Sequence, residues 1–312
     1  MKRQCNNKCF YWTERDCSKN RFETRPYSRV NYRGVCDHFQ AYVGRDGISY
    51  PIIDEWGKGA KYWDVAWNPM IGCRKSSEGC ANCYAARLAA QYPELQSADG
   101  GFEPHPPKHP KRPPKSGVVF CGNMTDLFGE WVDGLNIHEW ISALSPTATN
   151  LVLTKRAGRL RDLPDDLLAL EHVFFGITAE NQERLERRAP QIMKSGARKK
   201  WISLEPLLSP VNIAPYLLTE HQKRGHDAQY IPPRYDWQYR DRFDWVVVGA
   251  ESGHARRPCK LEWVRQIVED CQQYGVPVFV KQLDIDGKLE KDIAKFPTDL
   301  MIRQVPWKRG EA

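Results

Sequence analysis

Six short apolar segments recur between residues 118 and 281, and they constrain the fold more than any other feature of the chain. Each is too short for a helix and rich in β-branched or aromatic residues, which is typical of a strand buried on both faces. They are VVFCGN (118–123), NLVLTK (150–155), HVFFGIT (172–178), KWISLE (200–205), DWVVVGA (244–250) and VPVFVK (276–281). A shorter segment, VAWNP (65–69), is expected to open the series.

Amphipathic stretches lie between these segments. In the clearest, residues 261–275, the side chains of Val264, Ile267, Val268 and Cys271 form one apolar stripe, and Gly275 ends it. A second helix is expected over residues 84–92. Alternation of strands and helices predicts βα units, and therefore an α/β fold built as a full or partial barrel, or as an open doubly wound sheet.

Three regions depart from the alternation. Residues 100–117 are rich in proline and lysine and predict an extended loop, and residues 219–243 form a polar and aromatic excursion. Residues 1–55 show no clear periodicity but hold four of the ten cysteines. We therefore expect a Cys-rich N-terminal segment over 1–55 and one core domain over 56–312.

Composition limits the partners and the compartment. No apolar run is long enough to span a bilayer, and the basic N-terminus is not followed by the apolar stretch of a signal peptide. A cytoplasmic protein without a membrane partner is expected. The formal charge of +7 is compatible with a polyanionic partner but does not require one.

The central cysteines Cys73, Cys80 and Cys83 lie between a predicted strand and a predicted helix. In a reducing compartment such a group predicts metal ligands or catalytic thiols. Three thiolates can hold three irons of a [4Fe–4S] cluster and leave the fourth iron open, where S-adenosylmethionine can bind and be reduced. A structural zinc is the alternative, but the nearest further candidates, His105 and His109, lie in the extended loop.

Polar residues follow the predicted strands at their carboxyl ends, where α/β folds bind their ligands. Four of the charged residues among them are poorly suited to a purely structural role, so we take these four as candidate catalytic residues: Lys155, Glu205, Glu251 and Lys281. Glu205 and Glu251 are expected to face Lys155 and Lys281. The remainder of the ring is Asn123, Thr125, Asp126, Thr154, Glu180, Asn181, Ser252 and Gln282.

The other cysteines divide into two sets. Four thiols in the N-terminal segment predict a structural zinc site, with an auxiliary iron–sulfur cluster or four free thiols as alternatives: Cys5, Cys9, Cys17 and Cys36. Cys121, Cys259 and Cys271 are expected to be packing residues.

The run WNPMIGCRKSSEGCANCYAARLA (67–89) resembles the signature of a phage-associated family within the radical S-adenosylmethionine superfamily, distantly similar to spore photoproduct lyase. The likeness covers about residues 60–285. It continues through NMTDLFGEWV (123–132), LVLTKR (151–156), GITAENQE (176–183), ISLEPLL (202–208), VVVGAESGHARRP (246–258) and PVFVKQ (277–282).

The resemblance implies a partial (βα)6-type TIM barrel, a [4Fe–4S] cluster on Cys73, Cys80 and Cys83, and an electron donor such as flavodoxin or ferredoxin. It also implies that Asn123, Thr125 and Asp126 bind the amino group of S-adenosylmethionine, while Glu180 or Asn181 meets its ribose. The glycine-glycine-glutamate motif common in the superfamily is absent, and residues 123–126 occupy its place.

The function expected from this likeness is radical chemistry on a nucleobase during phage DNA hypermodification, in the host cell cytoplasm. The specific hypothesis is an isomerase that moves an aminoacyl-type substituent of thymine, such as glycinyl, from an N-linked to a C-linked position and so protects viral DNA from restriction. The alternatives are a radical repair lyase or peptide-modifying enzyme, and a non-catalytic zinc-containing nucleic-acid-binding protein.

Overall fold

The computed structural model describes residues 61–218 and 242–307, together with the backbone of residues 41–43 and 49–51. The four N-terminal cysteines and residues 219–241 lie outside these ranges. The strands are β1 (Ala41–Val43), β2 (Ser49–Pro51), β3 (Val65–Trp67), β4 (Val118–Cys121), β5 (Thr149–Thr154), β6 (Val173–Thr178), β7 (Lys199–Leu204), β8 (Trp245–Gly249), β9 (Val278–Ile285) and β10 (Lys288–Glu290). The α-helices are α2 (Tyr84–Gln91), α3 (Gly134–Ser142), α4 (Asp165–Leu168), α5 (Gln182–Met193) and α7 (Leu261–Tyr274). The 3₁₀ helices are η1 (Glu78–Cys80), η2 (Pro93–Leu95), η3 (Ala157–Asp162), η4 (Ala214–Tyr216), η6 (Ile293–Lys295) and η7 (Thr298–Leu300).

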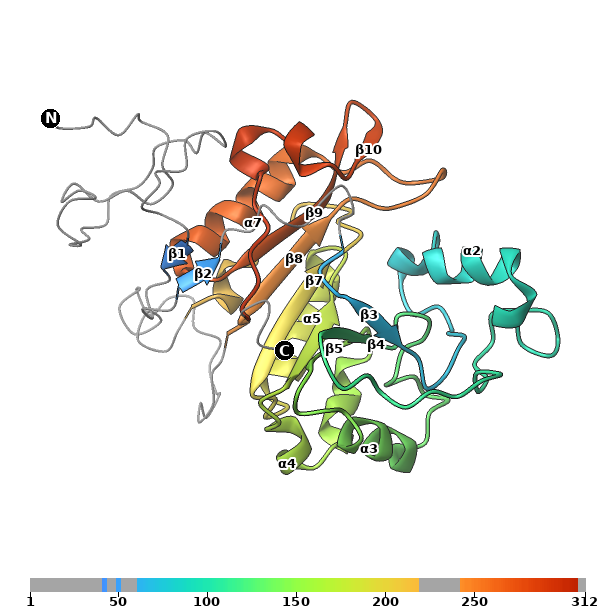
Figure 1. The fold of residues 1–312 in the computed structure, drawn as a ribbon. Coiled ribbons are helices and arrows are strands. Elements are labelled where there is room, and N and C mark those ends of the chain that lie inside the picture. Colours follow the sequence, from blue (N-terminus) through green and yellow to red (C-terminus); the bar gives the residue numbers. More distant parts are fainter. Residues whose placement is uncertain (1–40, 44–48, 52–60, 219–241, 308–312) are drawn as a thin grey trace, which may run out of the picture.

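An eight-stranded sheet forms the centre of the molecule (Figure 1). Its order is β10-β9-β8-β7-β6-β5-β4-β3, and every neighbouring pair from β3 to β9 is parallel. Strand order follows chain order without the reversal that defines a doubly wound sheet, so that alternative is excluded. β10 is added antiparallel to β9, while β1 and β2 form a separate antiparallel pair.

The predicted α/β alternation is confirmed. All seven expected strands are present within a few residues of their predicted bounds, and the helix expected at 261–275 is α7, which ends at Gly275 in the left-handed conformation (φ 67°). The loop over 100–117 contains no helix or strand, apart from one bridge between Ile71 and His105. None of the described helices is long and apolar enough to cross a membrane.

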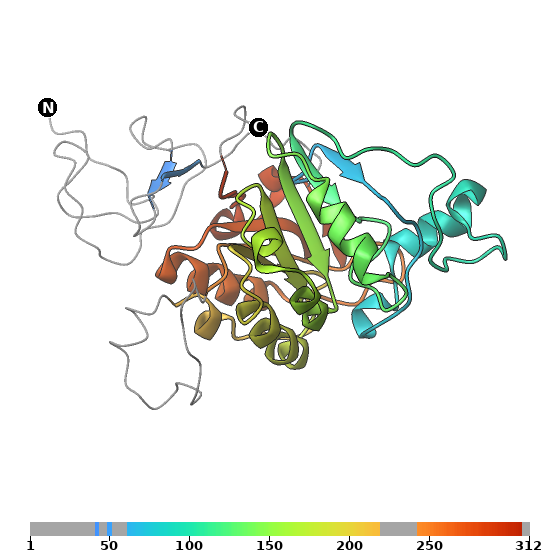
Figure 2. The same cartoon turned by 90° about the horizontal axis from the view of Figure 1, so that it is seen from below.

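The two faces of the sheet pack against different partners. One face packs against helices α3, α5 and α7, which line up along it in Figure 2, through residues such as Ile141, Ile192 and Ile267. The other face carries a smaller, aromatic core, to which the segment before β3 contributes Tyr62. Its rings are Tyr62, Phe120, Phe174, Trp201, Trp245 and Phe279. Both faces are therefore largely apolar.

Gly176 in β6 leaves room for the indole of Trp201. A Cβ atom there would lie 2.3 Å from Nε1 of Trp201. The Trp201 indole instead passes over this glycine and donates to the carbonyl oxygens of Val152 (3.2 Å) and Phe174 (3.1 Å). The absence of a side chain at 176 thus fixes the aromatic core below the strand ends.

Candidate functional site

The three central cysteines lie on one segment, residues 73–83, which we call the cysteine loop. It runs between β3 and α2 and is bound to the loops that follow three different strands. Arg156 after β5 donates to the carbonyl oxygen of Arg74 (3.1 Å), Ser77 donates to Glu180 after β6 (2.6 Å), and Asn82 donates to Glu251 after β8 (3.0 Å). The loop therefore lies over the carboxyl ends of the parallel strands.

The approach to the cysteine loop is bound to residues that follow β4. Asn68 donates to Oδ1 of Asn123 (2.7 Å) and accepts from the amide of Met124 (2.9 Å). Thr125 donates to the carbonyl oxygen of Gly72 (2.7 Å). Gly72 has φ 91°, and a Cβ there would lie 2.1 Å from the carbonyl oxygen of Glu103, so only glycine fits. Asn123 and Thr125 thus set where the loop begins.

Asp126 is a buried junction between β4 and β5. Its Oδ1 accepts from the amide of Phe128 (3.0 Å) and the hydroxyl of Thr154 (2.7 Å), and its Oδ2 accepts from the amide of Lys155 (3.0 Å) and from Arg156 (3.0 Å). Both carboxylate oxygens therefore accept hydrogen bonds from other groups of this chain, and this gives Asp126 a positioning role.

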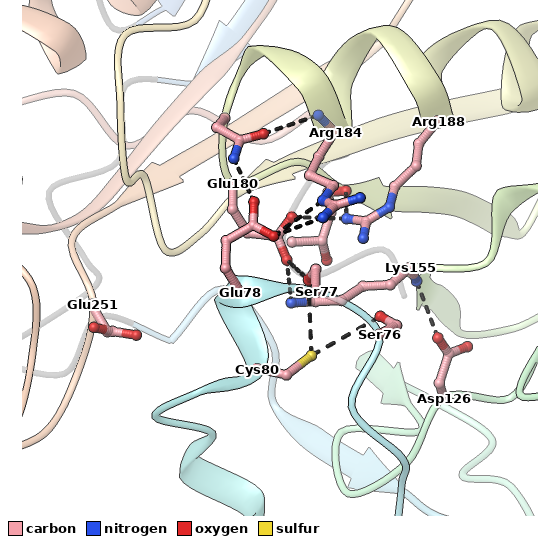
Figure 3. Close-up of polar contacts among 12 residues, drawn as sticks. Ser76, Ser77, Glu78, Cys80, Asp126, Lys155, Glu180, Arg184, Arg188 and Glu251 are labelled. Atoms are coloured by element: carbon pink, nitrogen blue, oxygen red, sulfur yellow. Dashed lines mark hydrogen bonds and ion pairs between the residues drawn. The ribbon is translucent and has the colours of Figure 1, made fainter.

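Glu180 is the centre of the site (Figure 3). Its side chain is fully buried, and it forms ion pairs with Lys155 through Oε1 and with Arg188 through Oε2 (2.8 Å), while Ser77 donates to Oε1. Burial alone would raise the pKa of Glu180, but Lys155 and Arg188 more than offset this, and the pKa is lowered. The carboxylate is therefore ionised and holds β5, α5 and the cysteine loop together.

Gly79 allows the cysteine loop to reach this carboxylate. A Cβ at position 79 would lie 2.4 Å from Cγ and Oε1 of Glu180. Real Cβ contacts are longer, so a side chain here would push the loop and Glu180 apart. The glycine between Glu78 and Cys80 is thus a requirement of the packing.

Glu78 fixes the same loop to the start of α5. It forms an ion pair with Arg184 (2.8 Å) and accepts from the side-chain amide of Asn181, whose Oδ1 caps the helix at the amide of Arg184 (2.9 Å). The hydrogen bond from Arg184 leads the effects that lower the pKa of Glu78 to about 2. Asn181 therefore both caps the N-terminus of α5 and contacts the cysteine loop.

Glu251 holds the far end of the cysteine loop, and in Figure 3 it lies apart from the Glu180 group. Both of its oxygens accept from Arg257, and Asn82 donates to Oε2 (3.0 Å). Burial opposes ionisation of Glu251, but the hydrogen bonds from Arg257 and Asn82 outweigh it and the pKa is lowered. Arg257 is thus a structural partner of Glu251.

A separate pair joins Glu205, which follows β7, to Lys281 within β9. Lys281 Nζ lies 3.0 Å from Oε1 of Glu205, and Ser203 donates to Oε2 (3.1 Å). The Lys281 ammonium also lies 5.6 Å from the ring centres of Tyr62 and Trp63. Burial and then the charge of Glu205 raise the pKa of the Tyr62 phenol well above its usual value. This pair therefore lies directly above the aromatic core.

The central thiols are free and half-buried. Burial opposes ionisation of Cys80, but Lys155 and the amides of Ser76 and Ser77 outweigh it and its pKa is lowered. Burial, and then Asp126, raise the pKa of Cys73 to about 12. Within the described ranges no three His, Cys, Asp or Glu side chains are grouped as a metal site. Cys121, Cys259 and Cys271 are buried in the larger core, as expected.

The structure brings much of the predicted ring together around the cysteine loop, leaves Glu205 and Lys281 as a separate pair, and corrects the expected charge pairing. Glu205 does face Lys281, whereas Lys155 pairs with Glu180 and Glu251 pairs with Arg257. The expectation that Lys155 and Glu251 would belong to the same set of facing charges as Glu205 and Lys281 is therefore wrong. The sequence interpretation also missed the partners Ser77, Asn82, Arg156, Arg184 and Arg188. Arg188 alone had a local signal, since it shares a buried helix face with Leu185, Ala189 and Ile192.

Comparison with known proteins gives one match. A family described as a protein of unknown function, DUF5131, matches residues 58–298 of the chain. No curated protein and no solved structure matches it. The matched range includes the cysteine loop and every charged residue of the ring.

Proposed function

The chain belongs to the DUF5131 family, and we propose that it is a radical S-adenosylmethionine enzyme. The observation that carries the proposal is the position of the cysteine loop, which lies over the ends of parallel strands and is bound there by Glu180, Asn181 and Glu251. Strand ends of this kind are where α/β folds bind ligands. The proposal includes a partial barrel, because β3 to β9 follow one another in order as barrel strands do.

The residues present fit a [4Fe–4S] cluster in number and chemistry. Cys73, Cys80 and Cys83 are three free thiols on one loop, and Lys155 favours the thiolate of Cys80, the form that binds iron. When bound, such a cluster supplies the electron that cleaves S-adenosylmethionine to a 5′-deoxyadenosyl radical. In the proposal an external donor such as flavodoxin or ferredoxin provides that electron.

The remaining groups divide between holding the loop and meeting a ligand. Asp126 and Glu251 have their oxygens occupied by partners in this chain, so we assign them to the first task. Lys281 and Glu205 form an ion pair with one another, and within the described residues no hydrogen bond or ion pair joins either of them to the cysteine loop, so we assign them to the second. They could exchange their mutual ion pair for a ligand's carboxylate and ammonium.

Anaerobic purification with iron analysis tests the cofactor. We expect about four irons per core site, and cysteine-to-alanine replacement at 73, 80 or 83 should remove most of that iron and abolish 5′-deoxyadenosine formation. Cys259→Ala is the matched control, since this thiol is buried in the apolar core and should not affect iron. Full iron and turnover in a variant of the loop, or zinc in its place, would exclude the proposal and favour the non-catalytic zinc protein.

Elemental analysis also tests the N-terminal segment, whose four cysteines lie outside the described residues. About one zinc per chain, lost on replacement of the N-terminal cysteines, is expected for a closed structural site. Extra iron without zinc would instead favour an auxiliary cluster on Cys5, Cys9, Cys17 and Cys36.

For the substrate we propose a DNA base bearing an aminoacyl-type substituent, rearranged from N-linked to C-linked. The support is the resemblance of the sequence to phage-associated radical enzymes, together with the Glu205–Lys281 pair, which offers both charges to a zwitterion. Reduced enzyme, S-adenosylmethionine and DNA containing N-linked glycinyl thymine should give a nucleoside of unchanged mass and altered chromatographic retention. A change of mass, or reaction only with a peptide, would favour the lyase or peptide-modifying alternatives.

A further inference from the structure

The loop before β4 contains a strongly basic segment, residues 104–116, which we call the basic strap. Its sequence, PHPPKHPKRPPKS, has six prolines, three lysines and one arginine and no acidic residue. Proline fixes φ and favours extended polyproline-type backbone, so the strap has little freedom to fold back on itself. Its four cations therefore follow one another along an extended line.

The backbone of the strap is anchored to the core at three points. His105 exchanges backbone hydrogen bonds with Ile71 (2.8 and 2.9 Å), and Trp67 at the end of β3 donates to the carbonyl oxygen of Lys111 (2.8 Å). Thr147 and Ser145, before β5, both donate to the carbonyl oxygen of Lys115. The strap is thus an anchored, extended segment that runs along the β3 edge of the sheet (Figure 1).

The charged side-chain groups of the strap have no acidic partner within the described part of the chain. Lys108, Lys111, Arg112 and Lys115 are all exposed, and no ion pair to a described acidic side chain involves them. By contrast, the charged groups beneath the cysteine loop are paired within the chain. A row of cations that have no described acidic partner, held on an anchored extended segment, is suited to a partner with repeated negative charges.

We propose that the basic strap binds the sugar–phosphate backbone of a nucleic acid, so that the substrate is a polymer and not a free nucleotide. This rests on the proposed function for the site that the polymer reaches. The strap is close to that site, because Cys73 donates its amide to the carbonyl oxygen of Phe102 (3.0 Å), two residues before the strap begins. A strand bound along the strap is therefore held beside the cysteine loop.

A neighbouring surface offers contacts for bases. Tyr84, Leu88 and Tyr92 are exposed and spaced four residues apart, so they share one face of α2 and its cap. Pro93, Glu94 and Gln96, which follow α2, line a groove together with strap residues His105, Pro106 and Lys108. Aromatic rings beside a row of cations, here the strap and not the groove itself, are the combination by which proteins bind unpaired nucleic acid strands.

Binding of a fluorescent single-stranded DNA, measured by anisotropy at several salt concentrations, tests the proposal. The variant is K108Q/K111Q/R112Q/K115Q. The control, R161Q/K260Q/K288Q/K291Q, removes four exposed cations elsewhere in the described chain. Both must first show the wild-type unfolding midpoint. In the strap variant, the magnitude of the slope of log affinity against log salt concentration should fall by roughly 3, and the affinity near 0.1 M salt should fall at least about 100-fold. In the control variant, both the slope and the affinity should change little.

Equal loss in both variants, or no loss in the strap variant, would overturn the proposal. It would also be overturned if wild type bound phosphatidylserine vesicles but no DNA, since the strap would then serve a lipid surface. The assay needs neither iron nor S-adenosylmethionine. If the proposed radical chemistry is wrong and the strap proposal is right, the protein should lack iron but still bind DNA. If the strap proposal is wrong and the radical chemistry is right, the protein should contain iron but bind DNA without dependence on salt.

Discussion

Replacing Glu180 with glutamine should destabilise the core and release the cysteine loop. The substitution keeps the size of the side chain and removes its charge. Arg188, only 5% exposed, would then face a neutral amide without another described acidic partner. Lys155, 19% exposed, could turn partly toward solvent. The main cost is therefore the buried charge of Arg188.

The expected loss in the free energy of unfolding is about 3 kcal/mol, the lower part of the range for removing one partner of a buried ion pair. Glu171→Gln is the matched control, because Glu171 also contacts two cations, Arg198 and Lys199, but its side chain is 61% exposed. Exposed pairs are screened by water, so this control should lose less than about 1 kcal/mol.

The difference between wild type and Glu180→Gln should also depend on pH. The folded pKa of Glu180 is lowered, so its contribution is fully present above the unfolded value, about 4.3, and is lost as pH falls through the folded pKa. Urea unfolding at neutral pH should therefore show the full difference between the two proteins. The difference should narrow below about pH 4.

Two measurements decide the outcome. Urea unfolding gives the free energies, and limited trypsin digestion with mass spectrometry reports cleavage after Arg74 and Lys75 inside the cysteine loop. Faster cleavage at these two bonds is expected only in the Glu180 variant. If Glu180→Gln were as stable and as resistant there as Glu171→Gln, Glu180 would not hold the loop, and the argument would be refuted.

Two further predictions concern the same loop. Gly79→Ala should lose about 1–3 kcal/mol in urea unfolding, because its Cβ would lie 2.4 Å from Glu180, whereas Gly101→Ala, with no neighbour nearer than 3.8 Å, should lose much less; equal losses would contradict the packing argument. In metal-free protein, iodoacetamide mapped by mass spectrometry should modify Cys80 at lower pH than Cys73, because the thiol pKa of Cys80 is lowered and that of Cys73 raised. The reverse order would show that Lys155 does not favour the Cys80 thiolate.

The sheet could be predicted because its strands are buried on both faces. Segments such as DWVVVGA are continuously apolar, without the alternation of polar and apolar residues that marks a half-exposed strand. A run that is both so short and so apolar is typical of a strand buried on both faces. β10 was missed because Lys288–Glu290 is short and mostly polar, and its pairing with β9 depends on a turn at Asp286 and Gly287. The sequence holds no apolar signal for such an edge hairpin.

The site could be predicted only as a set of strand ends. That Asp126, Glu180 and Glu251 gather at one edge follows from parallel strands. Their partners do not follow, because Ser77 lies 103 residues from Glu180 and Asn82 lies 169 residues from Glu251. Which cation meets which carboxylate depends on side-chain geometry, and this is why Lys155 was expected to face the wrong acid.

The strand order has a consequence for how the molecule assembles. Each strand of the parallel series pairs with its neighbours in the chain, so the sheet can grow by successive additions with modest loop-closure entropy. The contacts of Ser77 and Asn82 close far longer stretches of chain and require β6 and β8 to be in place. We therefore expect the cysteine loop to dock late in folding, after most of the sheet beneath it has formed.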